Sequence, residues 1–180
     1  SRPNLSYWQD AWRRVRKNKI AFFSLLLVAI YVLLAIFIPV FSPYNFATQD
    51  AGMINKPMSL SHWFGTDSLG RDLFVRLWMG ARVSLSIGFT AALLNAIIGT
   101  FIGGISGYCG CKLDMFIMRL VDVLYGIPNL IVTMLIMVII GRGVTSLIIA
   151  MVIVGWIGSC RFVRGEVLRL KEQEFVLAAK

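Results

Sequence analysis

The chain of 180 residues is strongly apolar and basic: 58% of its residues are hydrophobic, 15% are charged, the mean hydropathy is +0.76 and the formal net charge is +9. These values exclude a disordered chain and argue against a soluble or nucleic-acid-binding domain, because so few charged side chains do not cover the surface of a globule this size. The apolar residues therefore require lipid, and the positive charge reports on which side of a membrane each loop lies.

Residues 1–19 combine aromatic and basic side chains at helical spacing. Trp8, Trp12 and Val15 share one helix face, and Arg and Lys residues flank them. This pattern predicts an interfacial helix on the cytoplasmic leaflet. A nucleic-acid-binding arm would use the same basic residues, but the segment leads directly into an apolar run, which favours membrane lipid and no nucleic acid as its partner.

Residues 20–41 are predicted to form transmembrane helix 1. The run from Ile20 to Val40 contains 21 residues and no charge, which spans about 30 Å at the rise of an α-helix. A signal peptide is the competing interpretation because basic residues precede the run. The apolar region of a signal peptide is shorter and ends at a cleavage site of small residues. This run ends in a segment containing Pro39 and Pro43, which favours a membrane span.

Residues 42–82 are predicted to be an external loop with a short interfacial helix, formed by Leu73, Leu77 and Trp78 at helical spacing. Thr66 or Asp67 is expected to cap that helix. His62 with two aspartates does not resemble a metal site, so capping and Arg–Asp pairing are predicted there and no metal. The motif residues of this loop are Phe64, Gly65, Thr66, Asp67, Gly70, Arg71 and Asp72.

The second uncharged run predicts transmembrane helix 2 over 83–105, followed by a cytoplasmic loop over 106–119. Gly99, Gly103 and Gly107 recur every four residues and therefore share one helix face. Small residues in this register allow another helix to approach closely in lipid. Cys109 and Cys111 form a lone C-x-C pair, and with Cys160 the number of cysteines is odd, which argues against a disulfide framework and a closed metal site.

The last apolar runs predict transmembrane helices 3 and 4 over 120–140 and 144–160, joined by an external turn over 141–143. Pro128 is expected to bend helix 3. Arg119 and Asp122 lie three residues apart at its inner mouth and are expected to pair. The sequence therefore predicts an all-α polytopic membrane protein with four spans in this chain.

The distribution of basic residues predicts the orientation. Thirteen of the 18 Lys and Arg residues lie on the side of both termini and five on the other side. The positive-inside rule then places the N-terminus and residues 161–180 in the cytoplasm. Residues 161–180 are amphipathic and polar, as expected of a surface or docking helix.

Several segments together resemble one family, the permease subunits of ATP-binding-cassette importers of the oligopeptide/dipeptide/nickel branch. The segments that carry the resemblance are residues 12–19, 64–67, 69–72, 80–85, 118–128 and 174–179. The family's Glu-Ala-Ala signature falls on Leu177, Ala178 and Ala179, so Leu177 departs from the acidic consensus. The resemblance implies a type I importer permease fold with six spans in the intact protein, of which this chain, cut inside its coupling segment, holds four.

The resemblance also implies the function and the partners. The chain would form part of a path for oligopeptides or dipeptides, with nickel as the alternative cargo, in a bacterial cytoplasmic (inner) membrane. The partners would be a second, different permease subunit, two cytoplasmic ATPase subunits that bind ATP and magnesium, and an external substrate-binding protein. The chain itself would bind no cofactor. The ATPase-coupling residues are expected to be Glu172, Glu174, Phe175, Leu177, Ala178 and Ala179.

Two other classes of protein remain as alternatives. An intramembrane enzyme would need a nucleophile or metal site in or beside the spans, and the serines and threonines there have no base nearby in sequence, so no catalytic residues are predicted. A channel or scaffold built on the glycine face would not need the patterned external loop or the polar C-terminal segment. Both features favour the permease.

Overall fold

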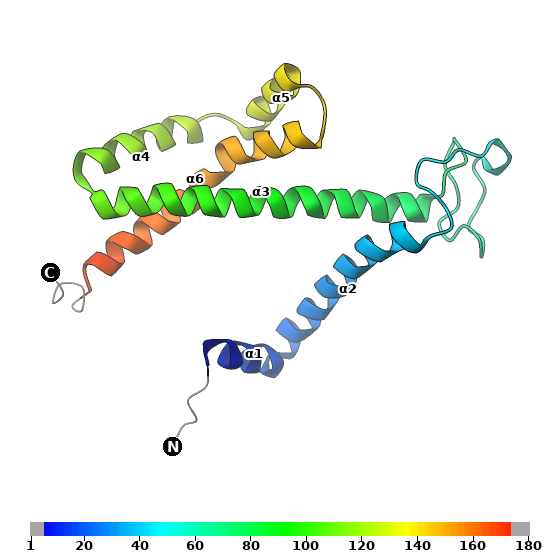
Figure 1. Ribbon diagram of the computed structural model, residues 1–180, viewed down its shortest axis with the longest axis horizontal. Coiled ribbons are helices and arrows are strands. Elements are labelled where there is room, and N and C mark those ends of the chain that lie inside the picture. The colour runs from blue at the N-terminus through cyan, green and yellow to red at the C-terminus, as the bar shows by residue number, and fades with distance from the viewer. Residues whose placement is uncertain (1–5, 174–180) are drawn as a thin grey trace. The chain divides into compact units, whose positions relative to one another are not determined.

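The computed structural model describes residues 6–173, which are helical apart from turns, loops and one isolated bridge between Thr66 and Asp72. The chain forms two compact units, Ser1–Leu85 and Ser86–Lys180. Figure 1 shows the helices, whose bounds are α1 Tyr7–Lys17, α2 Lys19–Phe41, the 3-10 turn η1 Ala51–Met53, α3 Leu73–Cys109, α4 Cys111–Tyr125, α5 Asn129–Ile140 and α6 Val144–Lys171.

In the first unit, a single residue, Asn18, separates α1 from α2. The Ser6 side chain and Gln9 form a capping box at the start of α1, and the Asn18 side chain accepts a hydrogen bond from the Ala21 N–H at the start of α2. These caps satisfy N–H groups that have no partner within their helix. The predicted helices within 1–19 and over 20–41 are both present.

Helix α3 is longer than predicted, with 37 residues from Leu73 to Cys109. The prediction of a separate interfacial helix before transmembrane helix 2 is wrong, because residues 73–109 form one continuous helix. No proline lies between residues 73 and 109 to interrupt it. The predicted caps, Thr66 and Asp67, are also wrong. Asp72 caps the helix instead, through a 2.8 Å hydrogen bond from the Val75 N–H.

The predicted loop over 106–119 is mostly helical. Helix α3 continues to Cys109 and α4 begins at Cys111, so only Gly110 separates the two helices. Gly110 has φ of +63°, a left-handed conformation that glycine adopts without steric cost. The chain therefore reverses at one residue, and both helices extend into the segment that sequence spacing assigned to a loop.

The predicted third span is broken rather than bent. Helices α4 and α5 meet at 82° across residues 126–128. Pro128 causes the break, because it lacks an N–H and disfavours helical geometry at Ile127. By length and composition, α2, α3 and α6 are long and apolar enough to cross a membrane. Counting the bent α4–α5 pair as one further span gives up to four spans.

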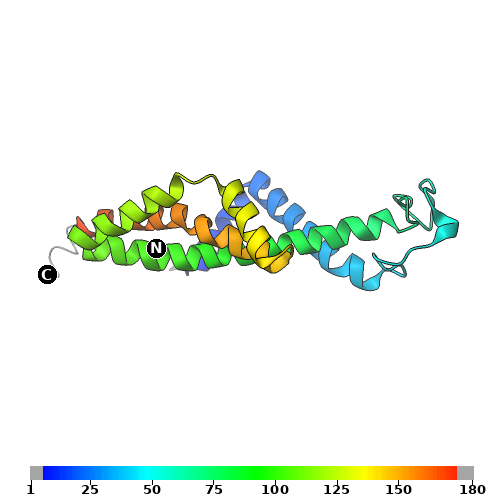
Figure 2. The same cartoon turned by 90° about the horizontal axis from the view of Figure 1, so that it is seen from above.

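The second unit packs around α6, as Figures 1 and 2 show. Its buried core consists of Val121, Val154, Trp156, Ile157 and Cys160. Outside this core most large apolar side chains are exposed, and α2 buries only Ala35. Such an apolar surface is expected where lipid rather than water surrounds the helices. Helix α6 runs without a break to Lys171, past the end at residue 160 that the sequence predicted.

Candidate functional site

Three glycines of α3 let the backbone of α6 approach closely. A Cβ atom on Gly99 would lie 2.4 Å from the Ser159 Cβ, and one on Gly103 would lie 2.4 Å from the Cys160 carbonyl oxygen. On Gly107 it would lie 2.9 Å from the Val167 Cβ. Real Cβ atoms do not approach so closely, so these contacts require glycine. The two helices therefore associate through backbone packing, as in other membrane helices with small residues in register.

Asn95 extends the same contact. Its side chain lies against Gly155, where an added Cβ would be 2.3 Å from Asn95 Nδ2. The Asn95 Oδ1 atom is buried and has no hydrogen-bond partner among the described residues. The Asn95 side chain of α3 therefore packs against the backbone of α6 at Gly155.

Asp114 joins three helices. Arg164 of α6 donates from Nε and Nη2 to the two carboxylate oxygens of Asp114 on α4. The Ser106 hydroxyl of α3 donates to the same carboxylate at 2.5 Å. Bidentate pairs between guanidinium and carboxylate groups fix geometry as well as charge. Sequence reasoning missed this pair because its members are 50 residues apart.

Asp122 forms a second ion pair between α4 and α6. Arg161 Nη2 lies 2.6 Å from Asp122 Oδ1, and the Arg161 guanidinium carbon lies 4.6 Å from the centre of the Tyr125 ring. The predicted Arg119–Asp122 pair is therefore wrong: α6 brings Arg161 to Asp122. We call the Asp114–Arg164 and Asp122–Arg161 pairs the ion-pair ladder.

Lys171, the last residue of α6, contacts the end of α3. Its ammonium group lies 2.9 Å from the Tyr108 carbonyl oxygen and 3.3 Å from that of Gly107. A cation is favourable there because the last carbonyls of a helix lack partners and carry partial negative charge. Glu172 follows as the C-terminal cap of α6. The other predicted coupling residues lie outside the described residues, and these are Glu174, Phe175, Leu177, Ala178 and Ala179.

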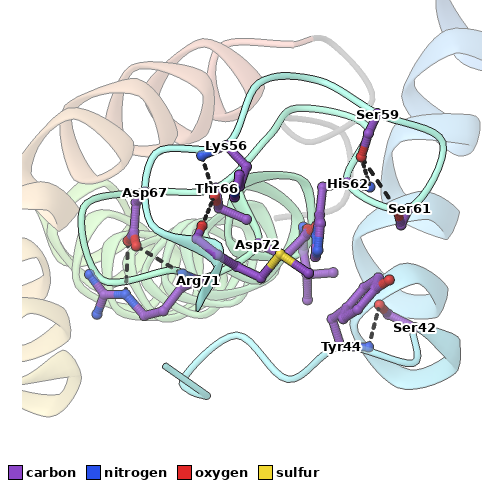
Figure 3. A network of polar contacts seen from close by, with 12 residues as sticks. Ser42, Tyr44, Lys56, Ser59, Ser61, His62, Thr66, Asp67, Arg71 and Asp72 are labelled. Atoms are coloured by element: carbon purple, nitrogen blue, oxygen red, sulfur yellow. Dashed lines mark hydrogen bonds and ion pairs between the residues drawn. The ribbon is translucent and has the colours of Figure 1, made fainter. Parts of the chain in front are cut away.

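Asp67 organises a tight turn in the 42–72 segment, which links α2 to α3 (Figure 3). Its carboxylate accepts from the N–H groups of Leu69 and Arg71 at 2.9 and 3.0 Å, and from Arg71 Nε at 2.8 Å. The Arg71 N–H, with the Leu69 N–H and the Arg71 guanidinium, lowers the pKa of Asp67 from 3.8 to about 2. The Arg–Asp pairing predicted for this loop is thus present.

Asp72 connects the segment to α3. Its carboxylate caps α3 through one oxygen and lies 2.8 Å from His62 Nδ1 through the other, and both side chains are buried. Figure 3 shows the Tyr44 ring beside His62, and their ring centres are 4.6 Å apart. Among residues 6–173 no group of three or more His, Cys, Asp or Glu side chains could hold a metal ion.

The remaining motif residues make contacts within the 42–72 segment and with the start of α3. Thr66 Oγ1 accepts from the Lys56 N–H at 2.9 Å and donates to the Met53 carbonyl oxygen. Gly65 and Gly70 both have φ of +73°, and the ring centre of Phe64 lies 5.1 Å from that of Phe74 at the start of α3. The segment is therefore an ordered structure built by the motif that the sequence singled out.

Comparison with known families identifies two matching regions. Residues 6–57 match the N-terminal TM domain of oligopeptide transport permease C. Residues 99–180 match the binding-protein-dependent transport system inner membrane component. The second region includes the glycine face and the ion-pair ladder.

Curated relatives align along almost the whole chain. The dipeptide transport system permease protein DppC of Bacillus subtilis is 48% identical over 179 residues, covering 99% of this chain and 56% of the relative. The oligopeptide transport system permease protein OppC of the same organism is 48% identical over 180 residues, covering 100% and 59%. The glutathione transport system permease protein GsiD of Escherichia coli is 38% identical over 174 residues, covering 96% and 57%.

The chain thus spans between 56% and 59% of the length of these three relatives. The all-helical structure with three to four candidate spans agrees with the two family matches. The chain belongs to the family of binding-protein-dependent inner membrane permeases, in the branch that carries the N-terminal domain of oligopeptide permease C.

Proposed function

We propose that this chain is part of a permease subunit of an ATP-driven importer and forms part of the path along which short peptides cross a bacterial inner membrane. The observation that carries the proposal is the 48% identity, along the whole chain, to proteins named as dipeptide and oligopeptide permeases. Peptides are favoured over nickel as cargo because the relatives are named for dipeptides, oligopeptides and glutathione.

In the proposed orientation both termini lie in the cytoplasm and the 42–72 segment faces outward. The support is the excess of basic residues on the side of the termini. Residues 172–179 would then meet a cytoplasmic ATPase subunit, which binds ATP and magnesium. A second permease subunit of different sequence would complete the path, and an external binding protein would deliver peptide to the outward side. This chain would contribute no catalytic residue.

The ion-pair ladder offers a route by which an ATPase could act on the membrane part of the chain. Helix α6 is continuous from Val144 to Lys171 and leads directly into the proposed coupling residues. The ladder ties the last turns of α6 to α4, and Ser106 ties the same node to α3. A displacement of residues 172–179 would therefore move α6 and α4 together. The break at residues 126–128 lets α4 change its angle to α5.

Reconstitution of the full-length complex in proteoliposomes tests the function. The complex contains both permeases, the ATPase subunits and the binding protein, and uptake of a labelled dipeptide, a labelled tetrapeptide and ⁶³Ni²⁺ is measured with and without ATP. We expect peptide uptake that requires ATP and is absent when the ATPase subunits carry a hydrolysis-deficient substitution. ATP-dependent nickel uptake without peptide uptake would overturn the proposal that the cargo is a peptide. Solute flux that does not depend on ATP would favour a channel over an ATP-driven importer.

A further inference from the structure

We propose that a basic cavity at the junction of α1 and α2 binds the headgroup of an anionic phospholipid. The cavity is a shallow surface depression open to its surroundings, with a volume of about 590 Å³. Its lining residues are Arg14, Lys17, Asn18, Lys19 and Ile20, and all five are exposed. Three of these five residues are cationic. The site shares no residue with the ion-pair ladder or the 42–72 segment, and it does not depend on the cargo or on the proposed function.

The position of the cavity along the chain places it at the membrane boundary. Lys19 is the first residue of α2, and Ile20 opens the uncharged run that spans the hydrocarbon core. One wall of the cavity is therefore apolar and belongs to the span, whereas the basic side chains lie just outside it. Phospholipid phosphates occupy this depth in a bilayer.

The charges in the cavity need an anion that the described chain does not supply. Asp10 pairs with Arg14 at 2.7 Å and offsets one positive charge. Among residues 6–173, Lys17 and Lys19 form no ion pair. Two ammonium groups beside a membrane span attract anionic headgroups more strongly than zwitterionic ones.

The rest of α1 holds the cavity against the membrane surface. Trp8 and Trp12, one turn apart, are 78% and 46% exposed, and the guanidinium carbon of Arg16 lies 5.2 Å from the centre of the Trp12 ring. Exposed tryptophans on one face of a short basic helix are typical of helices that lie in the bilayer interface. Arg14 and Lys17 lie on the opposite side of α1 from these tryptophans. Their long side chains reach the layer of lipid phosphates from the turns of α1 that adjoin the span.

A phospholipid fits the cavity better than free phosphate does. Ile20 is 79% exposed and offers an apolar surface to the glycerol backbone and acyl chains of a lipid, which inorganic phosphate lacks. The basic side chains select for negative charge, so phosphatidylglycerol is favoured over phosphatidylcholine.

Native mass spectrometry of the full-length complex tests the site. The complex is purified with phosphatidylglycerol and washed with excess phosphatidylcholine, and the phosphatidylglycerol molecules retained per copy are counted. The test variant is Lys17→Gln/Lys19→Gln. Its matched control, Arg13→Gln/Lys112→Gln, removes the same charge from residues that do not line the cavity. The same count is made after a wash with about 10 mM inorganic phosphate, a concentration high enough to compete at a weak anion site.

We expect the Lys17→Gln/Lys19→Gln complex to lose one retained phosphatidylglycerol per copy, with affinity about tenfold weaker, and the control to keep it. Equal losses in both variants would show that basic residues attract the lipid diffusely, and would overturn the proposed site. An unchanged count of retained phosphatidylglycerol would also overturn it. Displacement of the lipid by inorganic phosphate would also overturn it, in favour of a free-anion site. If the double variant does not assemble, the same comparison between Lys17→Gln and Arg13→Gln decides the question.

Discussion

Arg164 on α6 holds Asp114 on α4 through two parallel hydrogen bonds, although the residues are 50 positions apart in sequence. The pair is largely shielded, with side-chain exposures of 31% for Arg164 and 16% for Asp114. Since Ser106 binds the same carboxylate, three helices meet at one charge. The geometry of this node decides whether the end of α6 can move independently of α4.

Replacing Arg164 with alanine should destabilise the protein, because it leaves the shielded Asp114 carboxylate without its cation. We expect the free energy of unfolding to fall by about 1.5–3 kcal/mol, the range for hydrogen bonds to charged groups. Thermal unfolding of the complex in nanodiscs measures it. The control is Arg169→Ala, which breaks an exposed pair with Glu166 and should cost below about 0.5 kcal/mol. Equal effects of the two substitutions would show that the node contributes no more than a surface pair.

Gly103→Ala should force α6 away from α3, because its Cβ would lie 2.4 Å from the Cys160 carbonyl oxygen. Overpacking of this kind costs about 1–3 kcal/mol. Gly104→Ala is the matched control, since nothing lies within 4 Å of a Cβ there. Thermal unfolding should separate the neighbouring variants, and a Gly104 variant that is as unstable as the Gly103 variant would rule out the close helix contact.

Gly70→Ala should disrupt the 42–72 segment. The residue has φ of +73°, and an added Cβ would lie 1.8 Å from the Asp50 carbonyl oxygen. Limited proteolysis of this segment should become faster. Gly80→Ala, inside α3 with open space around it, should be neutral or stabilise α3 by up to about 1 kcal/mol. Unchanged protease resistance of the Gly70 variant would contradict the turn.

Asp67 should titrate far below an ordinary aspartate. Its pKa falls from 3.8 to about 2 because the Arg71 N–H, then the Leu69 N–H and the Arg71 guanidinium, stabilise the charged form. A folded-state pKa below the unfolded value means that the ionised group stabilises the fold above about pH 4, and that this stabilisation disappears as the pH falls toward 2. Carboxyl ¹³C NMR of labelled protein measures the titration.

The Arg71→Gln variant provides the control for that titration. It removes the guanidinium and keeps the backbone N–H that contributes most, so the pKa of Asp67 should rise only part of the way to 3.8. An Asp67 that titrates at 3.8 or above in the native protein would show that the turn is not formed in solution.

Local patterns predicted some parts of the structure well. Helices α1 and α2 follow directly from the amphipathic and apolar periods on either side of Asn18, and the break at Pro128 follows from its missing N–H. Continuity was harder to predict. Hydropathy marks where a helix is apolar but not where it ends, so α3 extends ten residues before Val83 and α6 eleven residues past Cys160.

The pairing of charges depends on tertiary contacts that one sequence does not reveal. Arg119 is the nearest base to Asp122 along α4, but the glycine face of α3 draws α6 close and brings Arg161 there instead. The Asp114–Arg164 pair has the same origin. The available signal was the set of acids at the edges of apolar helices, which in lipid need a partner. It identified Asp122 but not its partner.

The ratio of peptide uptake to ATP hydrolysis, measured in proteoliposomes, tests whether the ion-pair ladder links α6 to the transport path. It is compared among the native complex, the Arg164→Ala variant and the charge-reversed Asp114→Arg/Arg164→Asp variant. We predict that Arg164→Ala keeps ATP hydrolysis but lowers uptake per ATP by about tenfold, the equivalent of about 1.4 kcal/mol, and that charge reversal restores much of the loss. Native uptake per ATP in the Arg164→Ala complex would contradict the proposal that the ladder links α6 to the transport path.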